Sequence, residues 1–227
     1  MDARLEAIRR MIRPGRGVID VGTDHAYLPL SLARDGYPGA LLASDLREGP
    51  LAAARRSAAQ AGLSGRLCFL LADGLDACPP DAVDTIVIAG MGGDTICGIL
   101  DRAEWCMNGA YRLILQPMTK PEVLRYWLTN NGFRIEDEVL AEDAGTVYQI
   151  LSAVFCGRNE RLSDAELFVG KAGLSDPALY RRLIEMQICR AERSLAGLAA
   201  SGKTEDRKAD GLRRLICRLQ ELQKGST

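Results

Sequence analysis

Short apolar runs alternate with amphipathic stretches through the first 157 residues of the chain. This alternation is the pattern of a mostly parallel β-sheet with helices packed on its faces. It predicts five strands, at Gly17–Val21, Ala40–Asp45, Arg66–Ala72, Thr85–Ala89 and Arg112–Gln116. It also predicts four helices in the connections, at Tyr27–Asp35, Pro50–Ala61, Asp94–Leu100 and Pro121–Asn131.

Two further extended segments, Phe133–Ala141 and Thr146–Phe155, are separated only by the polar stretch 142–145. So short a connection favours an antiparallel hairpin. Five parallel strands followed by such a hairpin describe the seven-stranded sheet of a Rossmann-like class I methyltransferase better than a six-stranded, all-parallel dinucleotide fold. We therefore expect an α/β fold of the methyltransferase type.

After Gly157 the apolar positions change to helical heptad spacing. They are Ile184, Ile188, Ala191, Leu195 and Leu198 in one stretch, and Leu212, Leu215, Leu219 and Leu222 in a second. The segment between them is polar and contains two glycines, so the stretches are expected to pair as an antiparallel, coiled-coil-like hairpin. The chain is thus expected to divide into a catalytic domain, residues 1–157, and a helical domain, residues 158–227.

The seven cysteines show none of the paired spacings of a metal or redox site. No segment approaches the roughly 18 unbroken apolar residues of a membrane span, and the charged N-terminus does not resemble a signal peptide. We expect reduced thiols in a cytoplasmic protein, without a metal and without membrane association. The oligomeric state is left open, a monomer included.

The net charge of −1 conceals an uneven distribution. From residue 158 onward the chain carries 14 lysines and arginines against 10 acidic residues. The first sixteen residues contain a second concentration of positive charge, at Arg4, Arg9, Arg10, Arg13 and Arg16. Solvated helix faces produce the same pattern, but both basic segments are also candidates for contact with nucleic acid.

The ends of the first two predicted strands carry candidate cofactor ligands, because ligands of open α/β sheets bind beyond the carboxyl ends of the strands. Asp20 and Gly22 end the first strand, where glycine allows close approach of a ligand and the next helix offers unpaired N–H groups. Asp45, followed by Leu46, ends the second strand, where a carboxylate can accept hydrogen bonds from ribose hydroxyls. These features suit NAD and S-adenosylmethionine equally.

The next strands end in further polar and glycine-rich segments. Asp73 and Gly74 follow the third strand, where the carboxylate can accept from an adenine amino group and glycine leaves room for the ring, although Asp-Gly is also an ordinary turn. The fourth strand opens onto Gly90-Met91-Gly92-Gly93, expected to leave space for a ligand against bare backbone, with a flexible loop as the alternative. Gln116 ends the fifth strand, where its amide could read the edge of a base.

Four segments together resemble one family, the bacterial tRNA (adenine-22, N1)-methyltransferases of the TrmK type. They are Gly22-Thr23-Asp24-His25-Ala26-Tyr27-Leu28-Pro29, the segment from Asp84 through Gly93, Leu113-Ile114-Leu115-Gln116-Pro117, and the pair Val147-Tyr148. The similarity extends over the first 157 residues and is weaker in the helical tail. The chain departs from the family pattern with Thr23 in place of serine and Met118 in place of asparagine.

The resemblance implies transfer of a methyl group from S-adenosylmethionine to N1 of an adenine in the D-arm of tRNA, without a metal. It makes Asp24 the candidate carboxylate that stabilises the positive charge developing on the adenine. His25 would orient Asp24 or a phosphate, unless it is simply structural. Tyr27 and Tyr148 would sandwich the extruded base, unless they belong to the core.

The basic termini would then contact the phosphates of the tRNA. The candidate residues are Arg9, Arg10, Arg13, Arg190, Arg193, Arg207 and Arg214. Two alternatives stay open at this point. An NAD-dependent oxidoreductase could use Asp20, Gly22 and Asp45, although the remaining glycines of the dinucleotide fingerprint are missing. A non-catalytic RNA-binding module could have the same fold.

Overall fold

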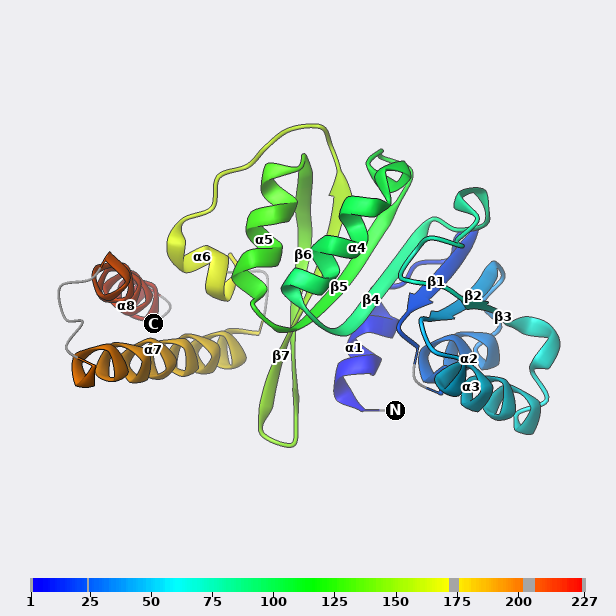
Figure 1. Cartoon of the computed structure of the whole chain (residues 1–227). Coiled ribbons are helices and arrows are strands. Elements are labelled where there is room, and N and C mark those ends of the chain that lie inside the picture. The colour runs from blue at the N-terminus through cyan, green and yellow to red at the C-terminus, as the bar shows by residue number, and fades with distance from the viewer. Residues whose placement is uncertain (1, 24, 172–175, 202–206, 226–227) are drawn as a thin grey trace.

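The computed structural model describes residues 2–23, 25–171, 176–201 and 207–225, and its centre is a seven-stranded sheet (Figure 1). The strand order is β3-β2-β1-β4-β5-β7-β6. The strands are β1 (Gly17–Val21), β2 (Ala40–Asp45), β3 (Cys68–Leu71), β4 (Thr85–Gly92), β5 (Arg112–Thr119), β6 (Phe133–Asp143) and β7 (Thr146–Phe155). Strands β1 to β5 are parallel, and β7 runs antiparallel to both β5 and β6. This arrangement confirms the predicted fold class.

Helices cover both faces of the sheet (Figure 1). On one face lie α4 (Gly93–Arg102) and α5 (Pro121–Asn130), whose buried leucines and isoleucines form a core with the sheet. On the other lie α1 (Ala3–Met11), α2 (Tyr27–Arg34) and α3 (Glu48–Gln60), with a second core. Each fully buried side chain of this kind stabilises the fold by about 1.5–3 kcal/mol.

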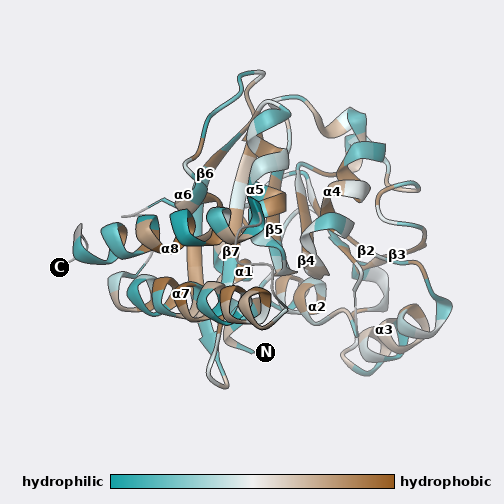
Figure 2. Ribbon diagram, turned by 60° about the vertical axis from the view of Figure 1, so that its left-hand side comes forward, coloured by the Kyte–Doolittle hydropathy of each residue, from teal (hydrophilic) through white to brown (hydrophobic). Residues whose placement is uncertain are grey.

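The C-terminal part contains α6 (Asp164–Val169), α7 (Pro177–Ala200) and α8 (Arg207–Gly225). Helices α7 and α8 lie side by side as the heptad spacing predicts (Figure 2). Their apolar cluster also includes Leu140 of β6 and Val147 of β7, so the helices pack against the edge hairpin of the sheet. The division of the chain at residue 157 stays a prediction, because this apolar contact joins the two parts.

A buried ion pair connects the sheet to the C-terminal helices. Arg125 of α5 donates from Nε to Glu138 of β6 at 2.7 Å, from Nη2 to Gln149 of β7 at 2.8 Å, and from Nη1 to the carbonyl oxygen of Leu167 in α6 at 2.9 Å. The second oxygen of Glu138 accepts from the backbone N–H of Lys171 at 3.0 Å. We call these five residues the junction network.

The structure corrects several predicted bounds. Helices α1 and α6 were not expected; in α1 the charges around Ile8, its one buried side chain, obscure the apolar pattern. Strand β3 is shorter than predicted because residues Ser64–Arg66 form a short 3-10 helix. The β6–β7 turn has only Ala144 and Gly145 between the strands, both with positive φ, as two-residue hairpin turns require.

Candidate active site

The carboxyl ends of β1 to β4 meet at one edge of the sheet. Strand pairing places Val21 of β1 beside Ser44 of β2 and Ile88 of β4, and Asp45 of β2 beside Leu71 of β3. The predicted cofactor ligands follow these positions directly in the chain. The topology therefore brings them to the same edge, which we call the carboxyl edge.

A strained turn connects β1 to α2 at the centre of the carboxyl edge. The backbone N–H groups of Gly22 and Thr23 both donate to the carbonyl oxygen of Ser44, at 2.8 and 3.0 Å. His25 and Ala26 then adopt left-handed backbone angles, with φ of 56° and 54°. Two successive non-glycine residues in this region store strain, which is typical of functional sites. Asp24 lies outside the described residues, so its predicted role is argued only as a proposal below.

Gly22 is required here for two structural reasons. Its φ of +74° favours glycine, and a Cβ at this position would overlap the terminal methyl group of Met91. The Met91 side chain therefore packs directly on the backbone of the turn. A side chain at residue 22 would displace the flexible end of Met91, whereas the positive φ would be strained for any other residue, so the backbone angle is the stronger reason for glycine.

Asp20 is a buried carboxylate just below this turn. The hydroxyl of Thr23 donates to its Oδ2 at 2.7 Å, and burial raises its pKa from 3.8 to about 6, while Thr23 and the charge of Arg4 act in the opposite direction. No salt bridge to Asp20 is present among the described residues. A cationic ligand group at the carboxyl edge would stabilise the ionised form of this carboxylate.

Asp45 and Leu46 lie at the carboxyl end of β2. The Oδ1 atom of Asp45 accepts from the backbone N–H of Arg47 at 2.8 Å, which fixes the carboxylate in place. The side chain of Leu46 is 66% exposed, unusual for a leucine next to a buried strand. A carboxylate held beside an exposed apolar side chain suits a ribose and a neighbouring base.

After β3, the room expected at Gly74 is absent, whereas the adenine contact of Asp73 stays a prediction. Asp73 is ion-paired with Arg102 at the end of α4, at 2.9 Å. Gly74 does not leave open room for an adenine ring, because a Cβ there would lie 2.8 Å from Ile99 of α4. Its φ of +63° and this close helix packing explain the glycine. An adenine contact through Asp73 would require the Arg102 pair to open.

The Gly90–Gly93 segment is not a loop. Residues through Gly92 continue β4, and Gly93 begins α4. A β-bulge with φ of +78° at Gly90 shifts the register between Ala89 and Met91. A Cβ on Gly93 would overlap the carbonyl oxygen of Lys120, so this glycine permits close packing of α4 against the β5–α5 connection. Close backbone packing explains Gly93, where the sequence suggested space for a ligand.

The Gln116 side chain is fully buried, which contradicts its predicted contact with a base edge. Its Oε1 accepts from Arg4 at 3.0 Å and from the backbone N–H of Gly90 at 3.1 Å. Its Nε2 donates to the carbonyl oxygen of Pro117 at 3.0 Å. The amide is therefore occupied by the protein's own groups and supports the β-bulge.

The two candidate aromatic side chains each have one face covered by the protein. Tyr27 is 55% exposed and stacks on His25, with ring centroids 5.5 Å apart. The ring of Tyr148 in β7 is covered by the guanidinium of Arg4, whose Cζ lies 5.7 Å from the ring centroid. Each ring can therefore offer only its other face to a base.

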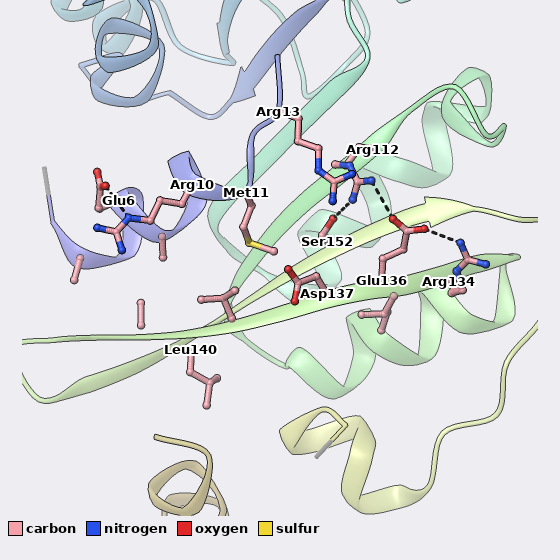
Figure 3. A pocket seen from close by; sticks show the side chains of 15 residues that line it. Glu6, Arg10, Met11, Arg13, Arg112, Arg134, Glu136, Asp137, Leu140 and Ser152 are labelled. Atoms are coloured by element: carbon pink, nitrogen blue, oxygen red, sulfur yellow. Dashed lines mark hydrogen bonds and ion pairs between the residues drawn. The ribbon is translucent and has the colours of Figure 1, made fainter. Parts of the chain in front are cut away.

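A cavity of about 930 Å³ lies away from the carboxyl edge, between α1 and β6 (Figure 3). Figure 3 shows Arg13 pointing into it from the segment after α1, while Arg112 and Arg134 are joined through Glu136. Its wall also includes Glu6 and Asp137, so basic and acidic groups are mixed. None of the predicted catalytic or cofactor-binding residues lines the cavity, although Arg10 and Arg13, two of the candidate RNA contacts, do. It is distinct from the site at the strand ends.

Comparison with known proteins identifies the family. A model described as "Methyltransferase domain" matches residues 1–151. The tRNA (adenine(22)-N(1))-methyltransferase of Bacillus subtilis is 32% identical over 170 residues, which are 75% of this chain and 71% of that protein. The chain belongs to this methyltransferase family. Membership confirms the resemblance noted in the sequence and selects methyl transfer over the oxidoreductase and the non-catalytic module.

Solved structures of the family share the whole architecture. The crystal structure of Bacillus subtilis TrmK is 28% identical and aligns with a TM-score of 0.80 over 100% of this chain and 98% of that one. A candidate tRNA (m1A22) methyltransferase of Streptococcus pneumoniae, crystallised with S-adenosyl-L-methionine, is 30% identical with a TM-score of 0.78, covering 94% and 98% of the two chains. The helical tail is therefore part of the shared family fold.

The described residues contain neither a membrane-spanning helix nor a metal-binding cluster. None of their helices is long and apolar enough to cross a membrane. Within the same residues there is no group of three or more histidine, cysteine or acidic side chains that could hold a metal ion.

The residue that sequence reasoning missed is Arg4, counted there only as one of several N-terminal positive charges. No local sequence signal marks it, because its contacts to Gln116 and Tyr148 cross more than a hundred positions.

Proposed function

We propose that this enzyme transfers the methyl group of S-adenosylmethionine to N1 of adenine 22 in tRNA. Family membership supports the reaction, and the Streptococcus pneumoniae relative in complex with S-adenosyl-L-methionine supports the cofactor. The observation that carries the proposal is the meeting of Asp20, the Gly22 turn and Asp45 at one edge of the sheet. The tRNA substrate also favours the cytoplasm as the site of action.

The residues at the carboxyl edge fit this cofactor. Asp45 would accept hydrogen bonds from the ribose hydroxyls, and the exposed side chain of Leu46 would pack against the adenine. Asp20 would stabilise the positive charge at the other end of the molecule, since its carboxylate lacks a salt bridge among the described residues. Bound S-adenosylmethionine supplies an electrophilic methyl group on a sulfonium.

The chemistry needs positioning more than it needs a base. The lone pair on N1 of adenine lies in the ring plane and is free at neutral pH, so in-line approach to the methyl group accounts for much of the rate. Positive charge leaves the sulfur and develops on the adenine, so a carboxylate beside the base stabilises the transition state. We assign this role to Asp24, which stands between Thr23 and His25 in the sequence.

The helical tail is proposed to contact the tRNA phosphates. Arg190, Arg193, Arg207 and Arg214 are exposed and form no ion pair with described residues. The N-terminal arginines differ: Arg9 and Arg10 both bind Glu6 and hold its pKa down to about 2. We therefore assign RNA binding to the arginines of α7 and α8 ahead of those of α1, with an affinity that falls steeply with salt.

Replacement of Asp24 by asparagine tests the proposed chemistry. We expect Asp24→Asn to slow methyl transfer about 100-fold or more, the usual effect of removing one preorganised electrostatic group. Affinity for S-adenosylmethionine in calorimetry should stay close to that of the wild type. The rate is measured in single turnovers on a tRNA transcript, with mass spectrometry to locate 1-methyladenosine.

Asp35→Asn is the matched control, because Asp35 lies at the opposite end of α2 and binds Arg9 on the surface. A transcript with guanine at position 22 controls for the target base. Equal rates for Asp24→Asn and the wild type would remove Asp24 from the mechanism. Methylation of the guanine-22 transcript at another adenine would contradict the proposed target.

A further inference from the structure

Arg4 connects the N-terminal helix to the carboxyl edge. It lies in the first turn of α1 and donates from Nη1 to Gln116 within β5. Its guanidinium also covers one face of the Tyr148 ring in β7. Its Nη1 lies 3.2 Å from the position that a Cβ on Gly90 would take, so the β4 bulge is in contact as well. One side chain from α1 thus meets β4, β5 and β7.

The contact with Gln116 determines how its amide is oriented. Arg4 and the N–H of Gly90 both donate to Oε1, which leaves Nε2 to donate to the carbonyl oxygen of Pro117. A charged donor strengthens the acceptor bond of a buried amide. Gln116 in turn holds the bulge that sets the direction of Met91. Loss of Arg4 would leave a buried acceptor with one donor fewer.

The contact with Tyr148 restricts the ring. A guanidinium stacked on one face contributes about 0.5–2 kcal/mol and holds the ring in one orientation. Only the opposite face is then available to a base, and that face has a defined direction relative to the strand ends. Arg4 itself is largely enclosed, since its side chain is 21% exposed, so it is poorly placed for contact with the phosphate backbone.

Helix α1 has other anchors. Ile8 is fully buried in the core against the sheet. Arg9 binds both Glu6 within the helix and Asp35 at the end of α2. The helix therefore does not depend on Arg4 for its attachment. Apart from an ion pair with Asp2 at 3.6 Å, the contacts of Arg4 described above are directed at the site.

We propose that Arg4 is a positioning residue for the methyl-accepting adenine, acting through the Tyr148 ring and the Gln116 amide. This inference rests on the proposed function and assigns to α1 a part in the reaction. Arg4 does not touch the reacting atoms. Its removal lets the ring and the bulge move, so that fewer bound adenines reach the in-line geometry.

The test compares Arg4→Ala, Arg4→Lys and the control Arg55→Ala in full-length enzyme. Arg55 of α3 is exposed, pairs with Glu48 and lies over the Phe69 ring at 5.6 Å, so it makes the same kind of contact with an aromatic ring as Arg4 does. We expect Arg4→Ala to lower kcat on tRNA about 10- to 100-fold, with KM for tRNA and affinity for S-adenosylmethionine within about threefold. Arg4→Lys should recover part of the loss, because an ammonium can donate to Gln116 but cannot stack as a plane. Arg55→Ala should match the wild type in kcat and in KM for tRNA.

A double-mutant cycle with Tyr148→Leu tests whether Arg4 acts through the Tyr148 ring. If Arg4 acts through the ring, the loss in Arg4→Ala/Tyr148→Leu is smaller than the product of the two single losses. A purely structural role would instead lower kcat, cofactor affinity and the urea midpoint together, and Lys would not restore kcat selectively. That result, or a kcat for Arg4→Ala within twofold of the wild type, overturns the proposal.

Methylation assays of the wild-type enzyme distinguish a failure of this inference from a failure of the proposed function. If the wild type leaves adenine 22 unmodified, the proposed function is wrong and the role of Arg4 falls with it. If the wild type methylates adenine 22 and Arg4→Ala does so equally well, only the role of Arg4 is wrong.

Discussion

The carboxyl edge and the junction network both bury charged side chains, but among the described residues only the junction network pairs its buried charges with each other. At the junction, Arg125 donates to three acceptors and Glu138 uses both oxygens, so both charges are compensated. At the carboxyl edge, Asp20 is held by the hydroxyl of Thr23, and burial raises its pKa to about 6. The chain satisfies charge fully where it only joins elements, and incompletely where a charged ligand is expected.

The backbone shows the same contrast. Of the described non-glycine residues with positive φ, three lie in the connections that follow β1 and β5, namely His25, Ala26 and Lys120, and the fourth, Ala144, lies in the β6–β7 hairpin turn. The residues of the junction network have no such angles. Strained backbone persists only where surrounding contacts impose it, and it is concentrated at sites of function. The comparison therefore predicts that mutations at the junction change stability, and that mutations at the edge change ligand binding.

Arg125→Met should have the largest effect on stability. It leaves Glu138 buried without its counter-charge, which costs about 3–5 kcal/mol of unfolding free energy. Urea denaturation measures the loss. Arg102→Met is the control, because Arg102 pairs with Asp73 and Asp76 at the surface, and an exposed pair contributes at most about 1 kcal/mol. Similar losses in the two variants would show that burial does not distinguish these ion pairs.

Asp20→Asn should change stability in the opposite direction. Because the folded pKa of about 6 lies above the ordinary 3.8, the folded chain holds this proton more tightly than the unfolded chain. Stability is therefore lost as pH rises from about 4 through about 6, by up to about 3 kcal/mol. The variant should be more stable than the wild type above pH 6, as urea midpoints at pH 5 to 8 would show, with the difference shrinking toward pH 4.

The same substitution should weaken cofactor binding, because the neutral amide cannot compensate a cationic group. Calorimetry with S-adenosylmethionine at pH 7.5 measures this loss. In the wild type, affinity should fall as pH decreases through about 6, and in Asp20→Asn this pH dependence should disappear. A variant that is less stable at pH 8 than the wild type would contradict the view that burial of this charge is costly.

Tyr27→Ala should have the smallest effect, and on binding alone. The ring is exposed, so the unfolding free energy should change by less than about 0.5 kcal/mol. Affinity for tRNA should fall by about 1–2 kcal/mol, within the range for one base stacked on one aromatic ring. Tyr126→Ala, an exposed tyrosine on α5, is the matched control in a filter-binding assay. Equal affinities for the two variants would remove Tyr27 from the RNA surface.

Particular residues show how far the sequence could predict this arrangement. Asp20, Gly22 and Asp45 could be placed at one edge because parallel strands align their carboxyl ends. Gln116 could not be assigned correctly, since an amide at the end of a strand is equally suited to a ligand or to a bulge. Its partners, Arg4 and Gly90, come from other elements. The glycines from Gly90 to Gly93 were expected to leave space for a ligand, but they belong to β4 and the start of α4, where Gly93 allows close packing against Lys120.

The succession of strands and helices along the chain, the helical hairpin and the family were determined by the sequence, because periodicity and short motifs are local properties of the chain. The tertiary structure alone decided which residues from distant parts of the chain are in contact. Arg4 reaches Gln116, Arg125 reaches Glu138, and Gly74 packs against Ile99, each across a separation that local patterns do not encode. Burial and close packing act between elements, so their consequences for pKa, strain and site geometry exist only in the folded chain.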